Sequence, residues 1–501
     1  MFYRRETIAN TPQIVEKTIQ AEKSARQSNT YCFDVANRPV LAADLLTGMV
    51  RTAIFDQLGF LGREMYVTRL IASIVVSALL MAAIFQPTAP MRLAENAASL
   101  RPTPASLANR TCPLAGSLFT HPFADIGDVI SVSPLGGVTA PGEPLPAPYI
   151  RINTRKGANQ FERRQTSVTS PARAEIKAIE RRILRRQDGR AKGQSWTVHF
   201  TVCEEVSFYL GDLDTVDPEI IRRAGGLAAF EEISGPDHVA ATMDVRVRPG
   251  TQIGLADGFD VGVEDQRIAP KELIRPERYA TSAYLTARVF DVPTQLIDAI
   301  ATDHTRAQCP LDYFPTELQT AWTGMLGDAF GMRRAKGEDA CRAALVDVAG
   351  TAQGAWFTDA ANNAVATKVS AIALASDNVD PSRQILSLHG RLKSLTPDMV
   401  ALTPKQRTAR EAAAKDFLTF SQGQGLVNRH FADTLRRQMY CYEDLRANFV
   451  GPRIVGVILL QVTEDETGAP RMKLEARSDA MACADLQQPW AFTGAETTFY
   501  R

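Results

Sequence analysis

Histidines and cysteines are the side chains that could carry metal or nucleophilic chemistry in this chain, and their spacing argues against both. None of the six histidines form a pair at zinc-binding spacing, and no Gly-x-Ser-x-Gly motif offers a serine nucleophile. Cys203 precedes Glu204 and Glu205, whose negative charges disfavour the thiolate that a nucleophile needs. We therefore predict no catalytic residue, no metal and no cofactor, and favour a protein that is not an enzyme.

The cysteines are better explained as disulfide partners. Six of the seven follow a long apolar segment, and an even number after an export signal is typical of an oxidising compartment. Cys203 pairs most simply with Cys112. The other four can pair in three ways: Cys309, Cys341, Cys441 and Cys483.

That apolar segment, Leu70–Phe85, contains no charged residue and follows Arg63 and Arg69. A basic flank before an apolar core is typical of a signal peptide or a membrane anchor. The excess of basic residues before the segment predicts a cytoplasmic N-terminus. We expect a periplasmic or extracellular protein, either cleaved free or held in the inner membrane by residues 70–85.

The composition describes a globular protein without a dominant charge. Lys+Arg and Asp+Glu are both 56, so no net field favours nucleic acid, and we predict no nucleic-acid partner. A length of 501 residues indicates more than one domain. The predicted order is an N-terminal extension (1–64), the signal or anchor (65–86), a linker (87–110), a first β domain (111–305) and a cysteine-containing β domain (306–501).

The hydrophobic pattern predicts a mainly β fold with helical insertions, after the N-terminal apolar helix. Ser195–Leu210 alternates and then becomes apolar, which indicates two strands or one bent strand. Val245–Val263 contains Pro-Gly and Gly turn signals and is predicted to be a β-hairpin. Helices are expected over the charged range Pro171–Arg186 and over Leu311–Phe330, with Phe330 facing the core. The second of the two β domains is therefore expected to be a barrel or sandwich.

The predicted hairpin resembles the last hairpin of the lysostaphin-type (LytM-like) zinc endopeptidases, barrel-sandwich enzymes that cut peptidoglycan cross-links. The resemblance covers about residues 128–265 and implies three zinc-ligand positions. Glu143, Asp212 and Asp260 stand at or near those positions, and the strand Phe259–Asp265 lacks the family's His-x-His pair. Carboxylates alone suit Ca²⁺ or Mg²⁺ better than zinc, but we expect these acids to face water.

The second domain offers a candidate ligand cleft. Trp356 follows a turn marked by two glycines, and further polar and aromatic side chains could join it: Asn428, His430, Tyr440 and Tyr442. The alternative is that these residues belong to the core and edges of a barrel.

Together these patterns favour an exported pseudo-enzyme that binds a cell-wall, carbohydrate or envelope protein partner without catalysis. One alternative is a zinc-dependent peptidoglycan hydrolase whose ligands lie elsewhere in the chain. Another is a protein whose C-terminal β domain binds a small ligand or a carbohydrate.

Overall fold

In the computed structural model, all described residues belong to the unit Arg101–Arg501. The residues that it describes are 106–113, 117–138, 146–155, 164–186, 189–270, 273–276, 292–337, 340–341, 347–358, 371–388, 417–447 and 453–501. The predicted N-terminal extension, the apolar segment and all but the end of the linker therefore lie outside the described residues. No helix within those ranges is long and apolar enough to cross a membrane.

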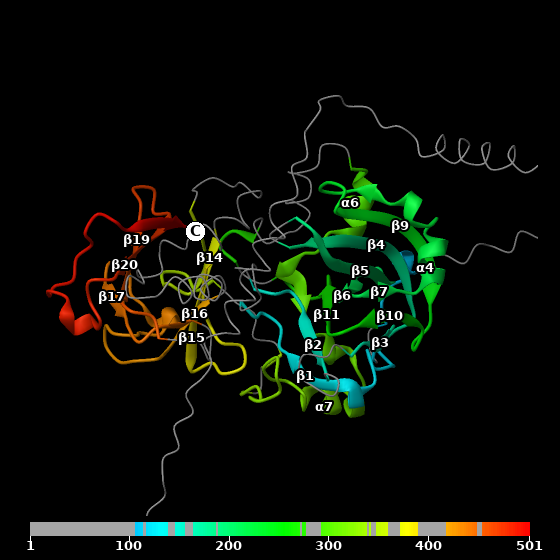
Figure 1. The fold of residues 1–501 in the computed structure, drawn as a ribbon, viewed down its shortest axis with the longest axis horizontal. Coiled ribbons are helices and arrows are strands. Elements are labelled where there is room, and N and C mark those ends of the chain that lie inside the picture. Colours follow the sequence, from blue (N-terminus) through cyan, green and yellow to red (C-terminus); the bar gives the residue numbers. More distant parts are fainter. Residues whose placement is uncertain are drawn as a thin grey trace, which may run out of the picture. The chain divides into compact units, whose positions relative to one another are not determined.

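The described residues form mainly antiparallel β-sheets, which confirms the mainly β part of the predicted fold class (Figure 1). Their α-helices are α4 (Pro218–Arg223), α6 (Thr294–Ile300) and α7 (Thr316–Thr323). The first large sheet has nine strands. In sheet order they are β1 (Val129–Ser133), β2 (Ile150–Thr154), β11 (Phe259–Asp265), β6 (Val206–Leu213), β5 (Ala191–Cys203), β4 (Ala174–Arg185), β9 (His238–Val247) and β8 (Glu231–Glu232), with β12 (Ala307–Gln308) also paired to β11.

The predicted helix over Pro171–Arg186 is wrong, because most of this range forms the strand β4. It pairs with β5 and β9 along its length, and a β-bulge interrupts its register between Ile176 and Ala178. Because the bulge inserts one residue, Ile176 and Ile179 both enter the core although they are three positions apart. An apolar spacing of three is typical of a helix, so the bulge gives this strand a helix-like sequence pattern.

The predicted hairpin over Val245–Val263 is also wrong. β10 (Gln252–Ala256) and β11 are separated only by Asp257 and Gly258, yet they belong to different sheets. β10 pairs with β3 (Thr166–Thr169) and β7 (Thr215–Val216) in a three-stranded sheet, whereas β11 pairs with β2, β6 and β12. Gly258 has a φ of 97°, which lets the chain turn between the sheets. Both strands then bury apolar side chains in one core.

The first hydrophobic core extends past the predicted domain boundary at residue 305. Cys309, Trp322 and Cys341 all belong to it, so the chain leaves this core only after Cys341. Trp322 at the end of α7 packs edge-on against Phe123. Phe330 is 70% exposed, which corrects the prediction that it faces inward. The reason is that α7 ends at Thr323, so Phe330 lies in a later loop.

The second large sheet is barrel-like and nearly closed. In sheet order its strands are β17 (Met439–Tyr442), β19 (Val457–Glu464), β20 (Pro470–Arg477), β21 (Thr497–Tyr500), β13 (Gly354–Phe357), β14 (Ala371–Ser376), β15 (Arg383–Leu388), β16 (Phe417–Ser421) and β18 (Arg446–Ala447). Only three residues connect β17 to β18, the two strands at opposite ends of this order. Three residues span only about 10 Å, so the sheet must curl until its edges approach.

Candidate functional site

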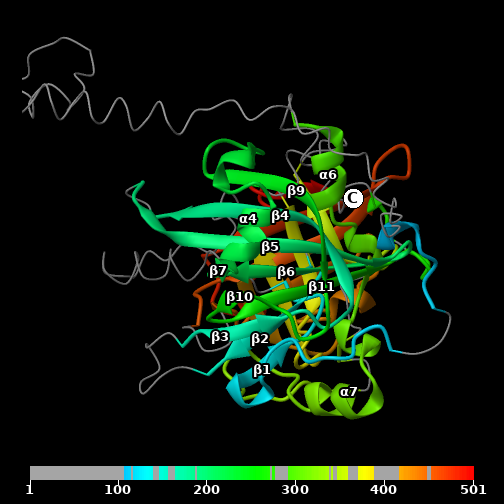
Figure 2. The same ribbon diagram turned by 90° about the vertical axis from the view of Figure 1, so that its right-hand side faces the viewer.

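The outer face of the first large sheet carries the polar residues of the candidate site. Side chains alternate between the two faces of a sheet, and Phe200 and Phe208 stack on each other in the core. Their neighbours His199 on β5 and Tyr209 on β6 therefore face outward, directly opposite each other. Tyr209 in turn lies opposite Gly262 on β11. Figure 2 shows β5, β6 and β11 running side by side, with β6 in the middle.

A buried carboxylate fixes the orientation of His199. Glu180 Oε1 lies 2.6 Å from His199 Nε2, and Glu180 Oε2 lies 2.8 Å from His238 Nε2. Burial alone would raise the pKa of Glu180, but the hydrogen bonds from the two histidines outweigh it and hold that pKa well below its usual range. The ionised carboxylate can only accept, so each Nε2 donates. The remaining nitrogen of a neutral His199, Nδ1, is then a hydrogen-bond acceptor.

Helix α6 packs on this outer face beside the polar residues. Leu296, Ile297 and Ile300 contact the small side chains Ala178 of β4 and Ala240 of β9. Both views place α6 next to β9 (Figures 1 and 2). The alanines leave room for the helix to approach the sheet, and the helix stops short of covering β5, β6 and β11.

A pocket with a volume of about 370 Å³ lies between α6, the residues that follow it, and strands β4, β5, β6 and β11. Its walls combine aromatic rings with hydroxyl groups, an amide and carboxylates. The hydroxyl and carboxylate groups belong to Thr201, Ser207, Tyr209, Thr302, Glu264 and Asp298. Pockets of about 300–1,000 Å³ with a few placed polar groups are the usual size for small-molecule sites.

Gly262 makes room for the ring of Tyr209. A Cβ atom at position 262 would lie 2.6 Å from the Tyr209 hydroxyl oxygen and closer still to two ring carbons. Only glycine therefore allows the ring to lie across β11. The Tyr209 ring also contacts His199, with 5.9 Å between ring centroids. Burial raises the pKa of Tyr209 well above its ordinary value, so its hydroxyl keeps its proton and can donate.

Glu264 is a carboxyl group of the pocket whose pKa is raised. Burial and the neighbouring negative charge of Asp303 raise its pKa to about 7, although the backbone N–H of Asp303 also donates to it. Lys177 lines the same pocket, but its ammonium group already contacts Glu175 at 3.2 Å and Asp244. Among the described residues, no basic side chain forms a salt bridge with Glu264.

The sequence-predicted acids form a different arrangement. Arg151 Nη2 lies 2.7 Å from Asp212 Oδ2, and Arg151 Nη1 lies 2.8 Å from Asp260 Oδ1. The two carboxylates, together with hydrogen bonds, outweigh burial and raise the pKa of Arg151. The guanidinium thus supplies a positive charge between these two acids. Glu143 lies outside the described residues.

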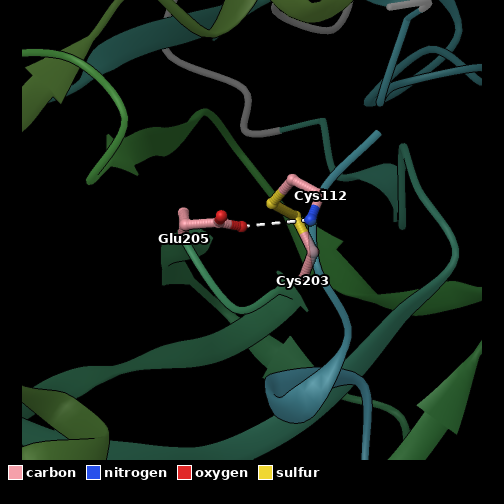
Figure 3. Close-up of side chains that lie close together, drawn as sticks. All are labelled: Cys112, Cys203 and Glu205. Atoms are coloured by element: carbon pink, nitrogen blue, oxygen red, sulfur yellow. Dashed lines mark hydrogen bonds between the residues drawn. A yellow bond between two sulfur atoms is a disulfide. The ribbon is translucent and has the colours of Figure 1, made fainter. Parts of the chain in front are cut away.

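One group of potential metal ligands is recognisable by distance within the described ranges: Cys112, Cys203 and Glu205. The two cysteines form a disulfide, so neither sulfur is a thiolate ligand (Figure 3). Glu205 Oε2 accepts a hydrogen bond of 3.0 Å from the backbone N–H of Cys112. The Cys112–Cys203 disulfide is the pairing that the sequence favoured, and it joins the segment before β1 to the end of β5.

The four remaining predicted cysteines pair as Cys309–Cys341 and Cys441–Cys483. This is one of the three arrangements that the sequence left open. The first bridge holds the segment that contains α7 against the first core. The second joins β17 to the segment that follows β20.

The structure corrects the prediction that aromatic and polar residues of the second domain line a ligand cleft. Trp356, Tyr440 and Tyr442 are at most 3% exposed and pack in the interior of the second sheet. Asn428 binds the backbone N–H and carbonyl of Glu443, and its φ of 51° places it in a tight turn. His430 accepts from the backbone N–H of Ala432. These side chains are occupied by packing and by local hydrogen bonds.

Sequence patterns do not single out the residues of the pocket. In the sequence, His199 is a lone histidine on an alternating strand. Tyr209, Gly262 and Glu264 become neighbours through the pairing of β6 with β11, which joins positions about fifty residues apart. The available signal was a tyrosine and a glycine on two separate alternating strands. That signal indicates a contact only when the register between the two strands is known.

The comparisons with known proteins give no relative for this chain. No protein-family model matches the sequence, and the searches of curated proteins and of solved structures find no match either.

Proposed function

We propose that this protein is an exported binding protein whose pocket beside α6 holds a small polar ligand. The observation that carries the proposal is a pocket of about 370 Å³ whose polar groups have their positions fixed by contacts outside it. Glu180 holds His199, and Gly262 provides the space for Tyr209. Side chains that are positioned before a ligand arrives lose less conformational entropy when it binds.

Two features support a role outside the cytoplasm. The six described cysteines all form disulfides, which persist in oxidising compartments. The apolar segment Leu70–Phe85 has the composition of an export signal or anchor. A periplasmic or extracellular protein would meet cell-wall fragments, carbohydrates and peptides, and the hydroxyl and amide groups of the pocket suit hydrogen bonding to such molecules.

Ligand-detected NMR on a library of small cationic, neutral and anionic compounds tests the pocket. Thr201→Trp should fill it, because Thr201 lines the pocket and tryptophan is much larger. Thr323→Trp is the matched control, since Thr323 is exposed at the end of α7, which contributes no residue to the pocket lining. Binding that Thr201→Trp abolishes and Thr323→Trp preserves supports the proposal. A library with no binder, or with binders indifferent to Thr201→Trp, refutes it.

A further inference from the structure

We infer that the ligand of this pocket carries a protonated amine, which binds the carboxylate of Glu264. The inference rests on the proposed function of the pocket and specifies the chemistry of its ligand. It starts from Glu264 itself, an acid that points into the pocket and makes no salt bridge within the described ranges. Glu264 is half-buried, and a carboxylate that is partly removed from water is less stable as an anion unless a positive partner or hydrogen bonds compensate; Glu264 has one backbone donor.

The other groups of the pocket also favour a donor-rich, cationic ligand. Asp298 adds a second carboxylate from α6, and His199 presents an acceptor nitrogen when it is neutral. Lys177 is the basic residue of the lining, and its ammonium group forms salt bridges with Glu175 and Asp244, which do not line the pocket. An anionic ligand would meet two carboxylates there with little compensation, whereas an ammonium group would supply the missing charge.

The titration of Glu264 gives this binding a recognisable pH dependence. The charged or titratable groups around it are Asp298, Asp303, His199, Tyr209 and Lys177. With a pKa of about 7, Glu264 is mostly protonated at pH 6 and mostly ionised at pH 8. An ammonium ligand binds the ionised form, so its affinity should rise about tenfold between these pH values. Alkyl amines stay protonated throughout that range, because their pKa values are near that of lysine.

Three probes of equal length separate charge from shape: 1,5-diaminopentane, 1,5-pentanediol and glutarate. Titrating each into the wild-type protein at pH 7.5, followed by NMR and calorimetry, should show binding of the diamine in preference to the other two. Glu264→Gln keeps the size of the side chain and removes its charge. It should weaken diamine binding about tenfold or more, as expected for a charge-assisted contact. Glu317→Gln, at an exposed position in α7, is the control and should leave binding unchanged.

The outcomes distinguish this inference from the function on which it rests. If the diol or glutarate binds best and Thr201→Trp abolishes that binding, the pocket is a ligand site and the amine inference is wrong. If none of the three probes binds, the amine inference is also overturned, and the wider library decides the function of the pocket. Calorimetry of the wild type in two buffers of different ionisation enthalpy adds a test that needs no variant. Diamine binding at pH 7 should release protons from Glu264, and no proton release would contradict the inference.

Discussion

Alanine at position 262 would place a methyl group where the Tyr209 ring now lies. The added Cβ would be 2.6 Å from the Tyr209 hydroxyl oxygen, whereas ordinary contacts begin at 3.4 Å. The ring or β11 must therefore move by about 1 Å, in a region where neighbouring strands restrict both. Overpacking of this kind costs about 1–3 kcal/mol, and we expect Gly262→Ala to lower the free energy of unfolding by that amount.

Gly193→Ala is the matched control for this substitution. Gly193 is also a strand glycine, on β5, but a Cβ atom added there would have no atom within 4 Å, and the φ of Gly193 is not in the left-handed region. Replacing it should change stability by less than about 1 kcal/mol, and in the stabilising direction, because alanine restricts the unfolded chain. The difference between the two variants in urea-induced unfolding isolates the clash with the ring.

A double variant links the clash to Tyr209. Tyr209→Ala alone removes a ring that packs on β11 and should itself destabilise the protein. With the ring gone, Gly262→Ala should cost much less than in the wild type, so the two effects should not add. Equal stability of Gly262→Ala and Gly193→Ala, or additive effects in the double variant, would refute the packing that we describe between β6 and β11.

The remaining predictions concern the two structural supports of the first sheet. Glu180→Gln should lower stability by about 1–3 kcal/mol, because an amide cannot accept from both histidines. The folded pKa of Glu180 lies below its ordinary value of 4.5, so its stabilisation is present above pH 4.5 and is lost as the pH falls further. The wild type should therefore lose its advantage over Glu180→Gln in acid unfolding experiments. Cys203→Ala should lower stability in oxidising buffer by about 2–5 kcal/mol, and an unchanged melting curve would argue against the bridge to Cys112.

Local patterns in the sequence predicted the class of fold but not the pairing of its strands. The alternation in Ser195–Leu210 indicated strands, and β5 and β6 cover that range. The same reasoning failed at β4, where the bulge beside Lys177 produced a helix-like spacing. The success and the failure have the same physical origin. Alternation in the sequence indicates which face of the sheet each side chain points to, and a bulge changes that face although the chain remains in the sheet.

The choice of strand partners connects these errors to the pocket. Had β10 and β11 formed the expected hairpin, β10 would have occupied one edge of β11. Instead β10 turns into the three-stranded sheet, and β11 pairs with β2 and β6 on its two sides. This placement sets Gly262 against Tyr209 and Glu264 opposite Ser207, so the pocket exists because the hairpin does not form. A change that made β10 pair with β11 would remove the pocket, because it would also remove the strand register that brings the pocket residues together.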